Sequence, residues 1–372
     1  MAEFRRAMVQ PGACTLPGRY YTSEEIFRAE VEQIFSRHWL CIGRAEQIPH
    51  PGDYMLVQIV DENLLVVRDR RGSIRAFFNV CRHRGSRLCT QERGRFSETI
   101  QCPYHAWTYS LDGRLIAARQ MQDVAGFDLA DYPLYRAALA EWEGFLFLNL
   151  APDPEPFEQF FAPLIDKFPA WQMPALRVGQ RIEYDVQANW KLIVENYSEC
   201  YHCPLIHPAL TQLTPPTSGR NDLTSGPFLG GYMTLNHPGG SMTTTGRTAR
   251  PPLGTVAGAD LGRVYYYSIF PNLLLSLHPD YVMAHVLWPQ SARRTRIVCE
   301  WLFDPDTIAQ PGFDPSDAVE FWDLTNRQDW QACELAQLGL SSRAYTPGPY
   351  AHAEGLLYAF DQEYLRLMRE EL

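Results

Sequence analysis

Hydrophobic and polar positions follow two different periods along the chain. In its first half, short runs of β-branched and aromatic residues occur at residues 54–59 and 64–68, and again further on. Gly, Asp and Asn residues punctuate these runs, which is typical of antiparallel strands joined by tight turns. Asp112-Gly113 is a further hairpin signal. The pattern predicts a small all-β domain over residues 40–150.

Helical spacing occurs on either side of this domain. After Ser23, apolar residues recur up to residue 37 and predict a helix within an N-terminal arm, residues 1–39, that packs on the rest. Asp314 and Pro315 form a helix start, and the long helix they open is expected to run to about Gly339. The other elements expected within residues 151–372 are helices at 157–168 and 353–369 and strands at 181–187, 263–270, 273–278, 282–289 and 295–303.

One segment shows neither the strand nor the helical spacing of apolar residues. Residues 209–262 are rich in Thr, Gly and Pro. Long irregular segments inside a compact domain usually serve function, often as lids. We therefore expect this segment to be a mobile cover over a pocket.

Composition narrows the class of protein. The chain has 372 residues, of which 46% are hydrophobic and 20% charged, as in ordinary globular proteins. The net charge of −10 argues against a nucleic-acid partner. No apolar run reaches the ~20 residues that a membrane span requires, and the start of the sequence lacks a secretory pattern. We expect a cytoplasmic protein whose scattered cysteines are thiols.

Two pairs of cysteine and histidine stand out in the β-rich region. Cys81 and His83 are separated by one residue, and Cys102 and His105 follow after 18 residues. A zinc site is one interpretation, but zinc-binding pairs usually have the spacing Cys-x2–4-Cys. Two thiolates and two imidazoles in paired loops fit a Rieske [2Fe-2S] cluster better, because there the cysteines hold one iron and the histidines the other.

A second cluster lies in residues 189–208. On a continuing helix, Glu199 and His202 would share one face. Pro204 is expected to end that helix, so that His207 curls back from the following turn. Two imidazoles so placed can bind one metal ion, although imidazole suits iron, zinc, copper and nickel alike. The alternative is a pair of histidines with only structural roles.

These motifs together resemble the oxygenase (α) component of Rieske non-haem iron oxygenases. The resemblance rests on the two Cys/His loops, on residues 189–208 and on Phe321–Trp330, and it covers nearly the whole chain. It implies an α+β fold, with a β-rich Rieske domain and a helix-grip catalytic domain whose antiparallel sheet surrounds a long helix. Ala106 departs from the family, which more often has Gly after the second histidine. We expect a slight backbone adjustment there and no loss of the cluster.

The resemblance also implies the metal ligands. Cys81, His83, Cys102 and His105 would hold the [2Fe-2S] cluster. His202 and His207 match the two imidazoles of a mononuclear Fe(II) site, and Asp323 matches its carboxylate. Asp329 is the competitor for that third position, and a solvated helix acid is the alternative for Asp323.

Glu199 matches the family's acidic residue that bridges the two metal centres. The resemblance implies a homotrimer, in which Glu199 accepts hydrogen bonds from His202 and from His105 of the partner subunit. The chain lacks a Gly-x-Gly-x-x-Gly fingerprint, so electrons from NAD(P)H are expected through a separate flavin/iron-sulfur reductase, with O2 as co-substrate. A Rieske electron-transfer protein without oxygenase activity is the alternative of another class.

Two substrate classes compete. Aromatic ring hydroxylation by a dioxygenase α subunit is one. The other is hydroxylation and demethylation of a quaternary ammonium compound of the glycine betaine, stachydrine, carnitine or choline type, which several local similarities favour. Aromatic faces bind such cations. The candidate pocket residues are Phe228, Tyr232, Tyr281 and Trp288, then Tyr265 and Tyr267, with Arg247, Arg250 and His237 as candidates for a substrate carboxylate.

Overall fold

The chain folds into two compact units. The computed structural model describes residues 4–237 and 239–369. One unit comprises the residues up to Ile34 together with those from Phe160 onward, and the other spans Phe35–Gln159. The domain limits expected at residues 40 and 150 both fall inside the second unit.

The unit Phe35–Gln159 is built of strands. Its larger sheet is antiparallel throughout. The loop with Cys81 and His83 follows a strand of this sheet, whereas the loop with Cys102 and His105 joins two strands of a smaller sheet. In order across the larger sheet, the strands are β1 (Leu40–Arg44), β10 (Phe145–Asn149), β9 (Arg136–Trp142), β4 (Ile74–Phe78), β3 (Glu62–Arg68), β2 (Asp53–Ile59) and β5 (Arg93–Arg95). Those of the smaller sheet are β6 (Thr99–Gln101), β7 (Thr108–Ser110) and β8 (Leu115–Ala117). The prediction of a β-rich domain is confirmed.

The other unit contains a seven-stranded antiparallel sheet. The four strands expected between residues 263 and 303 are present, and the strand expected at 181–187 is longer than predicted. In sheet order they are β11 (Arg177–Val186), β17 (Arg294–Phe303), β16 (Val282–Ser291), β15 (Leu273–Leu277), β14 (Arg263–Ile269), β13 (Phe228–Thr234) and β12 (Arg220–Thr224).

Strands β12 and β13 lie within the segment expected to be an irregular cover, so that prediction is wrong for residues 220–234. The reason is the pair Gly230-Gly231 in β13, which disguises a strand because glycine has a low strand propensity. A Cβ on Gly231 would lie 1.9 Å from the carbonyl oxygen of Arg220 on the neighbouring strand. The close approach of these two strands therefore requires glycine.

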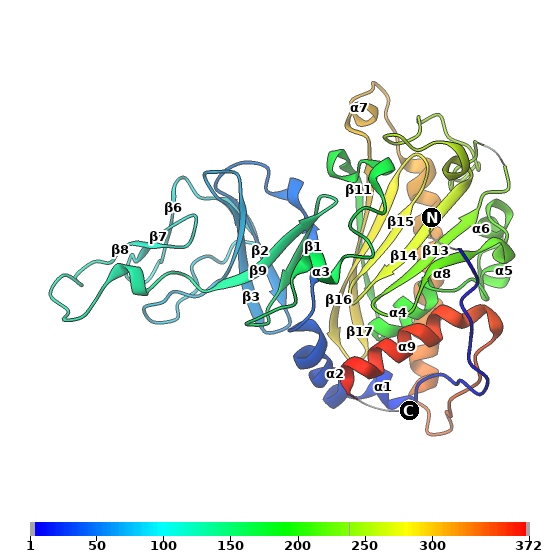
Figure 1. Ribbon diagram of the computed structural model, residues 1–372, viewed down its shortest axis with the longest axis horizontal. Coiled ribbons are helices and arrows are strands. Elements are labelled where there is room, and N and C mark those ends of the chain that lie inside the picture. The colour runs from blue at the N-terminus through cyan, green and yellow to red at the C-terminus, as the bar shows by residue number, and fades with distance from the viewer. Residues whose placement is uncertain (1–3, 238, 370–372) are drawn as a thin grey trace. The chain divides into compact units, whose positions relative to one another are not determined.

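Helices pack against this sheet, and Figure 1 shows α4, α8 and α9 gathered beside it. The helix expected at 157–168 is confined to one turn, because Pro163 interrupts it. The helix predicted after Ser23 is present as α2, and the Ser23 hydroxyl caps it by accepting the Ile26 N–H at 3.3 Å. The helices are α1 (Arg19–Thr22), α2 (Glu24–Glu30), a π-helical turn (Val31–Phe35), α3 (Phe157–Phe160), α4 (Trp190–Tyr197), α5 (Cys203–Ile206), α6 (Pro208–Leu213), α7 (Pro305–Ile308), α8 (Ser316–Leu340) and α9 (Gly355–Met368).

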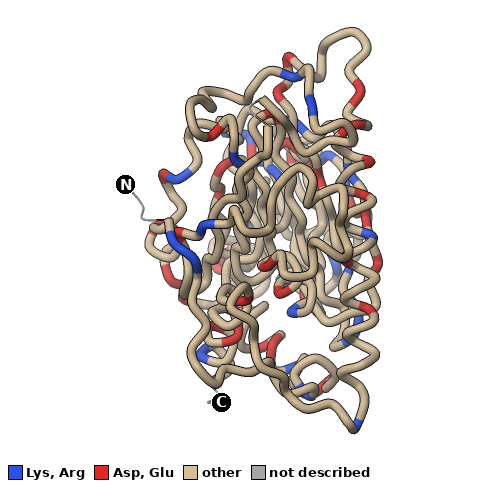
Figure 2. Tube along the Cα trace, turned by 90° about the vertical axis from the view of Figure 1, so that its right-hand side faces the viewer, with Lys and Arg blue, Asp and Glu red and all other residues tan. Residues whose placement is uncertain are grey.

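The helices and the charged residues can be checked for signs of a membrane span or of a one-signed charged stretch. Among the described residues, no helix is both long and apolar enough to cross a membrane. Figure 2 shows Lys and Arg positions interspersed with Asp and Glu positions along the chain. The acidic positions are therefore not gathered in one stretch of the chain in that view.

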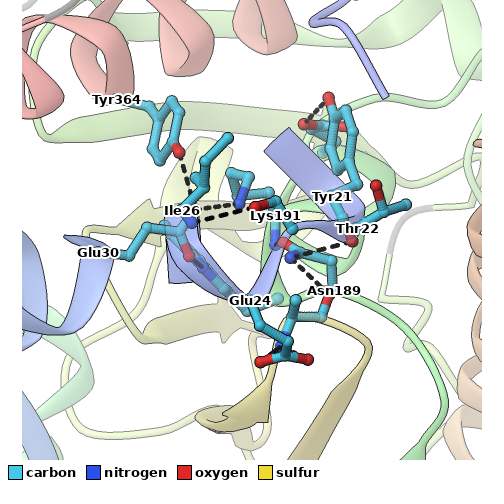
Figure 3. A network of polar contacts seen from close by, with 12 residues as sticks. Tyr21, Thr22, Glu24, Ile26, Glu30, Asn189, Lys191 and Tyr364 are labelled. Carbon is cyan, nitrogen blue, oxygen red and sulfur yellow. Dashed lines mark hydrogen bonds and ion pairs between the residues drawn. The ribbon is translucent and has the colours of Figure 1, made fainter. Parts of the chain in front are cut away.

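A buried ion pair fixes the start of α4 against the N-terminal helices. The ammonium group of Lys191 pairs with the carboxylate of Glu30 on α2, and both side chains are fully buried. Trp190 Nε1 donates to Glu30 at 2.8 Å, and the Tyr364 hydroxyl of α9 donates to it at 2.7 Å (Figure 3). Burial lowers the pKa of Lys191, while the Glu30 carboxylate opposes that shift. With four polar groups satisfied together, α2, α4 and α9 are held in one arrangement.

The long helix α8 is aligned with α4 by a second buried contact. The backbone N–H of Asn189, which caps α4, donates to Oε1 of Gln337 at 2.8 Å. Nε2 of Gln337 in turn donates to the carbonyl oxygen of Tyr21 at 2.9 Å. One side chain on α8 thus satisfies backbone groups from two other segments.

We predict that Gln337→Ala destabilises the fold by about 1–3 kcal/mol, because it leaves the buried Asn189 N–H without its side-chain acceptor. It also leaves the Tyr21 carbonyl with only the longer of its two hydrogen bonds, the one from Asn189 Nδ2 at 3.5 Å. Urea unfolding followed by circular dichroism measures the change in the free energy of unfolding. Gln331→Ala is the matched control, since it makes the same substitution at an exposed glutamine of the same helix. Equal stability of the two variants would contradict the prediction.

Candidate metal centres and the adjoining cavity

The two Cys/His loops come from different sheets, one between β4 and β5 and the other between β6 and β7, and their histidines are in contact. Cys81 and Cys102 are buried at 3% and 2% exposure, whereas His83 is exposed and His105 half-buried. The two imidazole rings lie 4.7 Å apart between centroids. Two thiols and two imidazoles are the donor set of a Rieske cluster, in which each pair holds one iron.

The spacing of these four donors argues against a single zinc ion. Donors around one tetrahedral zinc, at about 2.0–2.3 Å each, would lie within about 4 Å of one another. Within residues 4–237 and 239–369, the one group of three or more such donors whose ligand atoms all lie within 4.8 Å is elsewhere. Two separate pairs therefore fit a two-iron cluster.

The surroundings of the loops are suited to holding a cluster. The Tyr109 hydroxyl lies 3.3 Å from Sγ of Cys81 and accepts the backbone N–H of Arg82 at 3.1 Å. It is therefore free to donate its proton toward the sulfur, a contact of the kind that tunes cluster potentials. Trp107 stacks on His83 with an angle of 8° between the planes.

Ala106 occupies a position where glycine would be free of strain. Its φ is +57°, in the left-handed region. Its N–H donates to the Cys102 carbonyl at 3.1 Å, which closes the turn that carries His105. A side chain in this region costs about 1–2 kcal/mol. The turn is kept, and the departure from the family pattern is accommodated by backbone strain.

The second cluster begins where α4 ends. Helix α4 stops at Tyr197, so Glu199 and His202 are not on one helix face, and Pro204 begins a new helical turn where the sequence predicted an end. The reason is that proline is well tolerated in the first turn of a helix. His202 and His207 flank this short helix, α5, and a disulfide between Cys200 and Cys203 closes the loop around His202.

Three ligand groups converge at this point. Nε2 of His207 lies 2.7 Å from Oδ1 of Asp329, and Nε2 of His202 lies 3.3 Å from the same oxygen. These three residues form the one group in the described chain whose ligand atoms lie within 4.8 Å of one another. Two imidazoles and one carboxylate are the donor set of the facial triad that binds non-haem Fe(II).

The expectation that Asp323 supplies the carboxylate is wrong in this structure. Asp323 accepts from the Tyr184 hydroxyl at 2.7 Å and from Arg327 at 2.9 Å, away from the two histidines. Six residues on an α-helix turn a side chain by about 240°, so Asp323 and Asp329 face different directions. Asp329, which the sequence offered as the competitor, takes the place of the third ligand.

Each imidazole is oriented by a hydrogen bond from its other nitrogen. Nδ1 of His202 donates to Oε1 of Glu199 at 2.6 Å, and Nδ1 of His207 donates to Oε1 of Gln328 at 2.8 Å. Such partners fix the ring tautomer and leave both Nε2 atoms directed at the metal position. Sequence reasoning missed Gln328, although its place directly before Asp329 was available as a signal.

The charge of the site favours a cation. Burial lowers the pKa of His202, but hydrogen bonds to Asp329 and Glu199 outweigh burial and raise this pKa to about 9. Burial raises the pKa of Asp329, while hydrogen bonds from His202 and His207 outweigh burial and leave this pKa below its ordinary value. Two acidic side chains thus stabilise positive charge at this point, which a divalent metal ion would supply.

A cavity of about 620 Å³ opens beside the triad and includes Glu199 in its wall. Trp322 and Thr325 lie seven and four residues before Asp329 on α8, which places them on the same helix face. Gly230 and Gly231 of β13 also line the cavity, and their missing side chains leave room in front of the sheet. The aromatic residues that line it are Tyr197, Tyr201, Tyr232, Tyr266 and Trp322.

Of the four substrate-pocket residues predicted, only Tyr232 borders this cavity. Phe228 packs on Phe160 and Phe161, Tyr281 stacks on His278, and Trp288 lies under Arg296. These three predictions are wrong because each side chain points to another part of the core or surface. Tyr265, Tyr267, Arg247, Arg250 and His237 are likewise outside the described cavity wall.

Comparisons with known proteins agree with this geometry. Two protein-family models match the chain: that of the Rieske [2Fe-2S] domain over residues 38–133, and that of the ring hydroxylating alpha subunit (catalytic domain) over residues 173–370. The glycine betaine monooxygenase oxygenase subunit of Chromohalobacter salexigens is 35% identical over 376 residues, covering 91% of this chain and 82% of the relative. The carnitine monooxygenase oxygenase subunit of Escherichia coli is 37% identical over 203 residues, which are 54% of each protein.

Among solved structures, the quaternary ammonium Rieske monooxygenase CntA in complex with an inhibitor has a TM-score of 0.81 and 26% identity, covering 96% of both chains. Fold, donor sets and matches together define an enzyme of the Rieske non-haem iron class. The chain belongs to the α (oxygenase) subunits of that family. When bound, the [2Fe-2S] cluster supplies single electrons and the mononuclear iron supplies the dioxygen chemistry.

We predict that Asp329→Ala removes the mononuclear iron and that Asp323→Ala does not. Iron per chain should fall from about three, two in the cluster and one at the triad, to about two only in the first variant. Colorimetric iron analysis measures the total, and the EPR signal of the reduced cluster shows that the cluster is retained.

Asp323→Ala is the matched control, because it removes a carboxylate from the same helix. Loss of one iron from the Asp323 variant with retention in the Asp329 variant would reverse the assignment. About two irons in the unaltered protein would instead support an electron carrier.

Proposed function

We propose that the protein oxidises an N-methyl group of a small quaternary ammonium compound that carries a carboxylate. The observation that carries the proposal is that aromatic side chains share one cavity with the metal triad. A quaternary ammonium group has no N–H to donate, and aromatic faces are the groups that bind it. The names of the relatives, which are glycine betaine and carnitine monooxygenase subunits, support the same substrate class.

Three of these rings form a corner of the cavity. The ring centroids of Tyr197 and Tyr266 lie 6.1 Å apart, and those of Tyr266 and Trp322 lie 6.3 Å apart. Two of the three rings are fixed by hydrogen bonds, since the Tyr197 hydroxyl donates to the Leu275 carbonyl and Trp322 Nε1 donates to the Tyr281 hydroxyl. Rigid faces that need no rearrangement are suited to holding a cation beside the triad.

In the reaction, the protein positions the metal ligands and encloses the substrate. Glu199 and Gln328 hold the two imidazoles in orientation, while the cavity wall excludes water from the reacting N-methyl group. In the overall reaction, O2, two electrons and two protons convert one N-methyl group to N-hydroxymethyl and water. In the N-hydroxymethyl product the C–N bond then breaks, which releases formaldehyde and a proton and leaves the electron pair on nitrogen as a tertiary amine.

Two partners belong to the proposal. A separate reductase would deliver electrons from NAD(P)H, which the name "oxygenase subunit" of the relatives supports. A homotrimer would bring Glu199 near His105 of the partner subunit. In support, Glu199 already binds His202, and His105 is only half-buried in its own unit.

The substrate proposal is tested with the purified protein, a reductase and NADH. We expect formaldehyde and substrate-dependent NADH oxidation with at least one of glycine betaine, stachydrine and carnitine. Naphthalene and benzoate are the comparison substrates for ring hydroxylation. Turnover of an aromatic compound, with no response to any N-methyl compound, would overturn the proposal in favour of a ring-hydroxylating dioxygenase.

We predict that Glu199→Gln lowers NADH-driven turnover by about 10- to 100-fold, because a neutral amide no longer binds the His202 N–H as an anion. Iron content and the EPR signal of the cluster should stay unchanged. Glu320→Gln, which alters an exposed acid on α8, is the control. Unimpaired turnover in the Glu199 variant would remove the bridging role.

A further inference from the structure

The N-terminal segment Phe4–Val9 forms part of the cavity wall, although it lies far in sequence from the metal ligands. Residues 6–9 line the cavity together with Thr217, Gly219 and Asn221. The sequence predicts only that the N-terminal arm packs on the rest of the protein. The structure gives it a place at the substrate cavity.

Several contacts hold the segment there. Arg5 and Asn221 exchange two backbone hydrogen bonds of 2.7 and 2.6 Å, so the segment pairs with the edge strand β12. The ring of Phe4 packs edge-on against Tyr232 at 4.8 Å. On its other side, the backbone of Ala7 lies so close to Gly355 of α9 that a Cβ there would be 2.5 Å away. The segment is therefore fixed between the sheet edge and α9.

The charges around the cavity single out Arg6. Among the described residues that line it, Arg6 is the only lysine or arginine. Of the two arginines that the sequence offered for a carboxylate, Arg247 is outside the described cavity wall and Arg250 is paired with Asp280 and Asp317. Arg263, which lies over the Tyr232 ring, is 3.8 Å from Asp260.

The Arg6 head group is held at the rim and keeps donors for a ligand. Its Nη2 donates to the Thr217 carbonyl oxygen at 2.8 Å. This bond uses one of the five N–H donors of a guanidinium group. The carbonyl fixes the head group in position without neutralising its charge. A carboxylate could then be bound by the remaining donors, as planar guanidinium groups commonly do.

We propose that Arg6 is a specificity-determining residue that binds the carboxylate of the substrate. The inference rests on the proposed function and deepens it. The aromatic corner holds the quaternary ammonium group, and Arg6 supplies the opposite charge that orients the molecule across the cavity. An N-methyl compound without a carboxylate would lose this contact. Arg6 is a binding residue and has no role in the chemical step.

The test compares a betaine with its methyl ester, which keeps the trimethylammonium group and loses the negative charge. The probes are glycine betaine and carnitine, each with its ester. In the unaltered protein, we expect the acid to bind at least about tenfold more tightly than the ester. Arg6→Gln should raise Kd and KM for the acid about tenfold, leave the values for the ester unchanged and keep kcat for both. Calorimetry gives Kd independently of turnover.

The control is Arg5→Gln. Arg5 belongs to the same segment and pairs through its backbone, but its side chain is not among the described residues of the cavity wall. Arg6→Lys, which keeps the charge, should recover part of the preference for the acid. Equal weakening of acid and ester, or the same effect in the Arg5 and Arg6 variants, would show a structural role only and overturn the proposal.

Different results would rule out the role of Arg6 and the proposed substrate class. If the unaltered protein oxidises a betaine but Arg6→Gln leaves the preference for acid over ester intact, only the assignment of Arg6 falls. If the unaltered protein binds and oxidises no N-methyl compound, the substrate class and the role of Arg6 fall together.

Discussion

The hydrogen bond between the Asn189 N–H and the side chain of Gln337 is the contact on which the metal site depends. It sets the position of α8 relative to the start of α4. His202 and His207 follow α4, while Asp329 lies eight residues before Gln337 on α8. A slip of one residue along α8 would move Asp329 by about 1.5 Å and turn it by about 100°. Metal–ligand distances tolerate about 0.2 Å, so ligands from two segments require this alignment. The buried pair of Lys191 and Glu30 fixes the other side of α4 in the same way.

The local parts of the site could be predicted, and the long-range part could not. Cys81, His83, Cys102 and His105 occur in two short motifs, and His202 and His207 are five residues apart, so spacing offered both groups as candidates and the family resemblance assigned their roles. The third ligand comes from a helix more than a hundred residues later, where Asp323 and Asp329 were both available. One signal could have decided between them. Asp323 has Arg327 four residues on, which is typical of an exposed helix pair, whereas Asp329 shares its face with Cys333 and Gln337, which are buried.

The same distinction applies to the fold and the cavity. Strands rich in β-branched and aromatic residues, such as β2, β14 and β17, were predictable from their pattern. Strand β13 was not, because Gly230 and Gly231 carry no strand signal and their role is set by the approach of β12. These glycines also explain why the aromatic residues were misassigned. Gly231 pairs with Tyr266 on β14, and the space left by the glycines makes that part of the sheet a cavity wall. Which aromatic side chains border the cavity thus depends on residues that have no side chain, and periodicity within one strand does not show it.

The charge balance around the two histidines bears on how the proposed cationic substrate would be held. His202 donates to the carboxylate of Glu199, whereas His207 donates to the neutral amide of Gln328. A carboxylate partner makes an imidazole the stronger electron donor, so the two ligands differ in strength. Glu199 and Asp329 together carry two negative charges, which balance the two positive charges of a ferrous ion. With the metal end of the cavity close to neutral, net charge alone would not hold a quaternary ammonium group. Under the proposed function, the attraction would come from the rings of Tyr197, Tyr266 and Trp322, because the quadrupole of an aromatic face attracts a cation at short range.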